Sequence, residues 1–185
     1  MNGTASDELL ERIDQIGPID WSGDVFRYTT ARRDPQSGAG ARINGGRWNP
    51  PGLFPAIYLA IPENACMAEL DRAAQSQGVP PETLLRVPYK IHTLHVTEAR
   101  ILDLTGTRLE QVGLTADDVS GDDWEPCQAV GHGAWFLHFE GLLADSASGI
   151  GRVLTLFEGR LRPSVLQLVT SQDLTPDRYR KLRGA

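Results

Sequence analysis

The sequence has few of the residues and motifs that build a metal centre or a disulfide framework. Its two cysteines, Cys66 and Cys127, lie far apart, each in a helix-like pattern. We therefore expect two buried small hydrophobic side chains rather than a disulfide or a metal pair. No HExxH, CxxC or EF-hand pattern occurs, and the four histidines are more typical of structural positions. We predict no bound metal.

Long apolar runs and excess positive charge are also absent. No run approaches the roughly 18 residues that a membrane span needs. The opening segment, MNGTASDELLERIDQIG, is acidic and polar, unlike a secretory signal or a transit peptide. The formal net charge of −6 argues against bulk binding of nucleic acid, which favours a basic surface. We expect a cytoplasmic protein that binds neither membranes nor, directly, nucleic acid.

The length of 185 residues suits one domain, 1–185, able to bury roughly 70% of its unfolded surface. Strand-like segments outnumber helical ones and do not alternate regularly with them, which favours an α+β fold over a doubly wound sheet. The expected helices cover 7–16, 62–75, 124–138 and 175–182. The expected strands cover 25–30, 57–61, 84–87, 89–96, 101–104, 139–143, 153–157 and 165–170.

The stretch from Phe26 to Gly52 differs from the acidic remainder of the chain. It carries five arginines, one carboxylate (Asp34), five glycines and three prolines, so we expect much of it to be loop. Guanidinium groups on glycine-rich backbone suit phosphate, because the arginine fork binds oxygens in pairs and exposed N–H groups can approach closely. A solvated basic loop is the alternative interpretation.

The segments after this stretch carry three further candidate residues. Tyr58 stands in an apolar strand, Glu69 is an acid among small apolar neighbours on the next helix, and Ser146 lies in a later loop. Taken singly, they fit a core tyrosine, a solvated glutamate and a loop serine. Taken together with the arginines, they are stronger evidence for a functional site than any of them alone.

Several blocks of sequence are similar to one known family. The blocks are Arg27-Tyr28, Gly45-Gly46-Arg47-Trp48-Asn49-Pro50, Ala56-Ile57-Tyr58-Leu59-Ala60, Ala68-Glu69, Gly121-Asp122-Asp123-Trp124, Cys127-Gln128-Ala129-Val130-Gly131-His132 and Ala134-Trp135-Phe136-Leu137-His138. They resemble the RES-domain toxins, which are paired with Xre-type antitoxins in type II toxin–antitoxin systems. Within that family, the likeness is to members that consume NAD+ by phosphorolysis.

The resemblance implies a fold like that of ADP-ribosyltransferases and diphtheria-toxin-like enzymes, with a central mixed sheet and flanking helices. It also implies an NAD+ pocket, to which motif matching assigns Arg27, Tyr28, Arg47, Tyr58 and Glu69. The family serine is expected at Ser146, with Ser148 as the alternative. The substrates would be NAD+ and inorganic phosphate, without a prosthetic group. An antitoxin would cover the NAD+ cleft, and larger toxin–antitoxin assemblies are compatible with the likeness.

The residue types suit this chemistry. Nicotinamide leaves NAD+ as a neutral molecule, so the barrier lies in the cationic ribose, which a Glu69 carboxylate would stabilise. Arg27 and Arg47 would hold the pyrophosphate or the attacking phosphate, and Tyr58 and Tyr28 would stack on nicotinamide or orient the ribose. Ser146 would hydrogen-bond the amide. We predict Glu69, Arg47 and Tyr58 as catalytic residues.

Alternatives remain open at this point: transfer of ADP-ribose to a protein, hydrolysis by water, or a non-enzymatic protein whose arginine loop docks an acidic partner. Acceptor choice depends on pocket shape and water exclusion, which the sequence does not reveal.

Overall fold

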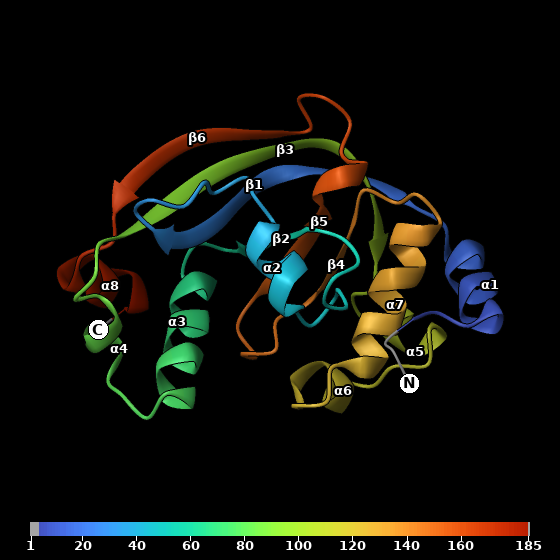
Figure 1. Cartoon of the computed structure of the whole chain (residues 1–185), viewed down its shortest axis with the longest axis horizontal. Coiled ribbons are helices and arrows are strands. Elements are labelled where there is room, and N and C mark those ends of the chain that lie inside the picture. Colours follow the sequence, from blue (N-terminus) through green and yellow to red (C-terminus); the bar gives the residue numbers. More distant parts are fainter. Residues whose placement is uncertain (1–3, 185) are drawn as a thin grey trace.

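Two long antiparallel strands, β1 (Ile19–Thr30) and β3 (Tyr89–Asp103), run through the fold (Figure 1). The structure is a computed structural model that describes residues 4–184. In it, β1 and β3 pair along almost their whole length, with a register shift between Trp21 and Gly23. This strand pair gives the remaining elements a continuous support.

Four further strands complete a mixed sheet. The strand β6 (Leu166–Asp173) pairs antiparallel with β3, and β4 (Gly141–Asp145) pairs parallel with the end of β3. The strand β5 (Arg152–Phe157) lies antiparallel between β4 and β2 (Ala56–Ile61). The order is β1-β2-β5-β4-β3-β6, with β1 also joined to β3. A mixed sheet with flanking helices confirms the α+β prediction.

The helices gather at the two ends of this sheet (Figure 1). At one end lie α3 (Ala65–Ser76), α4 (Pro81–Leu84) and α8 (Pro176–Arg183). At the other lie α1 (Asp7–Ile16), α5 (Arg108–Gln111), α6 (Ala116–Ser120) and α7 (Glu125–Phe136). The short α2 (Ala39–Asn44) stands between them, and a 3-10 turn covers Glu158–Arg160. No helix within residues 4–184 combines the length and apolarity of a membrane span.

Local sequence signals define several helix ends as expected. The Ser6 hydroxyl accepts a hydrogen bond from the Leu9 amide at the start of α1, and Gly17 ends that helix with a φ of 69°. Thr175 caps α8 in the same way, because its side chain accepts from the Arg178 amide. These caps explain why both helices begin where the sequence predicts.

Other predicted boundaries of helices and strands were wrong. Residues 84–87, expected as a strand, belong to the end of α4 and a following turn, because Pro81 occupies the first turn of a helix. The two strands expected over 89–104 form the single strand β3. Glu98 takes a φ of 48° within this strand, and its amide donates a hydrogen bond to the Ser22 hydroxyl of β1. The chain therefore bends there without leaving the sheet.

The contact between α7 and the turn of residues 45–50 positions the candidate site; we call this turn the Arg47 turn. The Trp48 side chain, 1% exposed, packs in a core cluster with residues of α1 and α7. A Cβ atom placed on Gly131 would lie 1.8 Å from the Trp48 carbonyl oxygen. The glycine therefore allows helix and turn to meet backbone to backbone.

Candidate functional site

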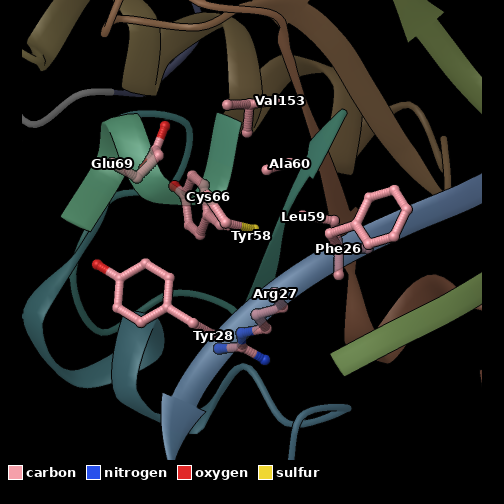
Figure 2. A pocket seen from close by; sticks show the side chains of 9 residues that line it. All are labelled: Phe26, Arg27, Tyr28, Tyr58, Leu59, Ala60, Cys66, Glu69 and Val153. Atoms are coloured by element: carbon pink, nitrogen blue, oxygen red, sulfur yellow. The ribbon is translucent and has the colours of Figure 1, made fainter. Parts of the chain in front are cut away.

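Two neighbouring hollows share a wall that includes Tyr58 and Glu69. The first hollow has a volume of about 190 Å³ and is lined by Phe26, Arg27, Tyr28, Tyr58, Leu59, Ala60, Cys66, Glu69 and Val153 (Figure 2). The second has a volume of about 280 Å³ and is lined by Ala41, Gly45, Gly46, Arg47, Trp48, Tyr58, Glu69, Arg72, Trp124, Asp145, Ala147 and Val153. A substrate bound beside Glu69 can therefore be approached from two sides.

Glu69 projects from α3 and is half-buried at this shared wall. Burial raises the pKa of the Glu69 carboxyl, while the Ser146 hydrogen bond and the charges of Arg72 and Arg47 oppose that rise. The Ser146 hydroxyl donates a hydrogen bond to Oε1 of Glu69 at 3.1 Å. A desolvated carboxylate with little direct neutralisation is suited to stabilise a developing positive charge.

Ser146 is buried at the end of β4 and makes the contact with Glu69. Ser148 lies behind it: its amide donates to the Ser146 hydroxyl oxygen at 3.2 Å, and the two hydroxyls are 2.8 Å apart. Of the two candidate serines, Ser146 thus reaches the carboxylate and Ser148 supports Ser146.

Arg47 faces the second hollow from the Arg47 turn. Its Nη1 donates to the carbonyl oxygens of Gly121 at 2.9 Å and Asp118 at 3.4 Å, and the guanidinium lies 5.4 Å from the Trp124 ring centroid. Burial lowers the pKa of the Arg47 guanidinium. The turn, the end of α6 and the start of α7 are therefore joined through this one side chain.

Tyr58 supports the same turn through two hydrogen bonds. Its hydroxyl donates to Asn49 Oδ1 at 2.8 Å and accepts from the Trp48 amide at 2.9 Å. A Cβ atom on Gly46 would lie 2.3 Å from this hydroxyl oxygen, so the glycine permits the approach. Burial raises the pKa of Tyr58, which keeps the hydroxyl neutral. Tyr58 therefore lines both hollows, and its hydrogen bonds also hold the turn that carries Arg47.

Arg27 and Tyr28 belong to β1 and line the first hollow with Tyr58 and Glu69 (Figure 2). The Arg27 Nη1 donates to the carbonyl oxygens of Pro35 at 2.7 Å and Ser37 at 3.0 Å, so this arginine also anchors the loop after β1. Burial lowers the pKa of Arg27 and raises that of Tyr28, to which the charge of Glu69 adds. Five of the six residues predicted from the sequence thus line two adjoining hollows, and the sixth, Ser146, lines neither but hydrogen-bonds Glu69.

Comparisons with known proteins identify the family of this chain. The profile of the RES domain matches residues 24–177. The chain belongs to the RES-domain family. It is 53% identical over 185 residues, and over the full length of both chains, to proteins named NAD(+) phosphorylase MbcT from Mycobacterium bovis and Mycobacterium tuberculosis. The family resemblance seen in the sequence is confirmed.

A solved structure shares the fold of this RES-domain chain. The crystal structure of the M. tuberculosis MbcT–MbcA toxin–antitoxin complex matches it with a TM-score of 0.92 and 53% identity, covering 97% of this chain and 99% of the other. The expected ADP-ribosyltransferase-like α+β fold is thereby confirmed. The roles of the individual site residues stay predictions.

Arg72 was not assigned a role from the sequence. It follows Glu69 by three positions on α3, so the two side chains share one side of the helix. Its Nη1 donates to the Ala147 carbonyl at 2.6 Å and its Nη2 to the Ser120 carbonyl at 3.0 Å. The helical spacing placed Arg72 beside Glu69, but only the fold brings the loops of residues 120 and 147 to it.

The RES-domain chain offers no metal site among residues 4–184, where no group of three or more His, Cys, Asp or Glu side chains is placed to hold an ion. His92 instead bridges the Thr29 hydroxyl at 2.9 Å and the Ser171 hydroxyl at 2.8 Å. Both cysteines are buried and free, as predicted, and burial raises the pKa of Cys127 to about 11.

Proposed function

We propose that this RES-domain protein is an NAD+ phosphorylase and the toxin of a toxin–antitoxin pair, with residues 1–185 acting as a single domain. The observation that carries the proposal is the position of Glu69, a desolvated carboxylate in the wall shared by two hollows, with arginines in both. The full-length relatives named NAD(+) phosphorylase MbcT support it. The protein would act in the cytoplasm, on the NAD+ present there.

The residues suit cleavage of the bond between nicotinamide and ribose. Nicotinamide carries a positive charge in NAD+ and leaves neutral, so no general acid is needed. Positive charge then develops on the ribose, and the Glu69 carboxylate stabilises it. Ser146 holds that carboxylate by its hydrogen bond, and Tyr58 fixes the turn that carries Arg47. Arg27 and Tyr28 bind the dinucleotide from β1.

Inorganic phosphate is the acceptor in this proposal, giving nicotinamide and ADP-ribose-1″-phosphate. No prosthetic group takes part. A second protein, an Xre-type antitoxin, would cover the two hollows and prevent depletion of NAD+. The related M. tuberculosis toxin has been solved as a complex with MbcA, which supports such a pairing.

The test is to incubate the purified, antitoxin-free protein with NAD+, with and without inorganic phosphate, and to identify the products by phosphorus NMR. We expect loss of NAD+ that depends on phosphate and yields a phosphorylated ADP-ribose. Free ADP-ribose at a rate independent of phosphate would make the protein a glycohydrolase. A mass increase on a protein, with little free product, would indicate ADP-ribosyl transfer. If NAD+ stays intact at every enzyme concentration, the protein is a non-enzymatic binding protein.

A further inference from the structure

Two arginines from distant parts of the sequence face one cavity. Arg47 comes from the Arg47 turn and Arg72 from α3, and both line the second hollow, of about 280 Å³. Glu69 also lines this hollow, and it lines the first hollow as well. The first hollow has one arginine, Arg27, among mainly aromatic and apolar neighbours, whereas the second holds this pair of cations.

The hydrogen bonds of both guanidiniums fix their positions without neutralising their charge. Arg47 donates to the carbonyl oxygens of Asp118 and Gly121, and Arg72 donates to those of Ser120 and Ala147. All of these acceptors are neutral backbone groups. Within residues 4–184, no carboxylate oxygen lies within the 4.0 Å of an ion pair from either guanidinium. Further N–H groups on each arginine therefore remain to bind an anion.

Two carboxylates, Glu69 and Asp145, also line this cavity, but neither forms an ion pair with Arg47 or Arg72. Glu69 receives its hydrogen bond from Ser146. Asp145 has a side chain that is 70% exposed, and it lies 3.8 Å from Arg152. After burial, the charge of Arg72 is a further cause that lowers the pKa of Arg47. Arg47, which burial desolvates, and the half-buried Arg72 repel each other and have no carboxylate ion-pair partner within residues 4–184, which favours the binding of an anion between them.

We propose that Arg47 and Arg72 form the subsite for the inorganic phosphate that attacks the ribose, while nicotinamide leaves into the first hollow. This inference rests on the proposed function and adds a division of labour to it. The planar guanidinium fork matches phosphate oxygens, and its positions are set in advance by the backbone carbonyls. Arg72, for which the sequence analysis predicts no role, becomes a substrate-binding residue.

The bond changes balance within this arrangement. An oxygen of monohydrogen phosphate forms a bond to the ribose carbon as the bond from that carbon to the nicotinamide nitrogen breaks. The electron pair of the broken bond goes to the nicotinamide nitrogen, which becomes neutral. The proton stays on the new phosphate ester. Glu69, in the wall common to both hollows, lies beside the carbon on which positive charge develops.

The first test compares the Michaelis constants of Arg72→Gln for phosphate and for NAD+. We expect the Michaelis constant for phosphate to rise about tenfold or more, because one charged contact to the anion is lost. The Michaelis constant for NAD+ should change about twofold at most. Arg72→Lys keeps the charge without the fork and should lie between wild type and Arg72→Gln. Arg12→Gln, on α1, is the matched control and should leave both constants unchanged.

The second test does not depend on turnover. Inorganic phosphate alone should raise the Tm of the wild-type protein, and Arg72→Gln should lose most of that protection relative to its own Tm without phosphate. If Arg72→Gln fails to fold, the same Tm measurement is made on Arg72→Lys. A rise in the constant for NAD+ with an unchanged constant for phosphate would overturn the proposal, since the pair would then bind the dinucleotide. Equal phosphate protection of wild type and variant would also overturn it.

The two tests separate this proposal from the proposed function. If the wild type cleaves NAD+ without regard to phosphate, the phosphorylase assignment fails. The thermal measurement then decides the subsite alone: protection that requires Arg72 supports it, and absence of protection overturns it.

Discussion

The Ser146 hydroxyl donates a 3.1 Å hydrogen bond to the Glu69 carboxylate and so joins the end of β4 to helix α3 across 77 positions of sequence. Its single hydrogen is used there, so the neighbouring Ser148 hydroxyl must donate to Ser146. The Ser148 amide donates to Ser146 as well. This chain of donors ends at the carboxylate and favours its charged form.

Ser146→Ala should therefore shift the pH dependence of turnover. Burial already raises the pKa of Glu69, and the Ser146 hydrogen bond opposes that rise. Without it the pKa rises further, and the acidic limb of kcat against pH should move to higher pH. Ser146→Thr should restore the wild-type profile, and Ser148→Ala should give a smaller shift. A pH profile of Ser146→Ala that superimposes on wild type would contradict this role.

Tyr58→Phe should loosen the Arg47 turn. The change removes the acceptor of the Trp48 amide and the donor to the buried Asn49 Oδ1. Leaving such groups unsatisfied costs about 1–3 kcal/mol of unfolding free energy. Urea denaturation of Tyr58→Phe and Tyr89→Phe measures the difference, because the Tyr89 hydroxyl has no hydrogen-bond partner within residues 4–184. Equal stability of the two variants would show that the hydroxyl of Tyr58 does not support the turn.

Gly131→Ala tests the backbone contact beneath the site. The new methyl group would meet the Trp48 carbonyl oxygen at 1.8 Å, and a backbone atom cannot move away at low cost. We expect a net loss of about 2 kcal/mol in unfolding free energy, even after the gain in helix propensity. Gly159→Ala is the matched control, because its added Cβ meets nothing within 4 Å. If both variants match wild type in chemical denaturation, α7 and the turn are not as tightly packed as described.

Local chemistry explains which features the sequence predicted. Ser6, Gly17 and Thr175 act through neighbours within a few residues, so the ends of α1 and α8 followed from the sequence. The short helices α2, α5 and α6, of four to six residues, gave no usable periodicity. They form because the surrounding fold holds them, which the sequence alone does not show.

The sequence likewise predicted some features of the candidate site and not others. Residue type and family blocks selected Glu69 and the arginines, but the partners of each are long-range. Arg72 acquires its place from the carbonyls of Ser120 and Ala147, which are 48 and 75 positions away. Backbone carbonyls carry no sequence signature, so neither the role of Arg72 nor the separation of the two hollows could be predicted.

Glu69→Gln should also stabilise the fold at neutral pH. The folded-state pKa of Glu69 is raised by burial, so above that pKa the folded protein bears the cost of a desolvated charge. The cost disappears as the pH falls through the folded pKa towards the ordinary value of a glutamate. The Tm of Glu69→Gln should therefore exceed that of wild type at neutral pH, and the difference should shrink on acidification. A lower Tm at neutral pH would contradict this expectation.

The most direct measurement is turnover of NAD+ by Glu69→Gln at saturating NAD+ and phosphate, beside wild type and the surface control Glu110→Gln on α5. The amide keeps the shape of the side chain but removes the charge that stabilises the ribose cation. We predict that kcat falls by about 10²–10³-fold while the binding of NAD+ changes little. The Glu110→Gln control should match wild type. Cleavage of NAD+ by Glu69→Gln at the wild-type rate would contradict the central claim.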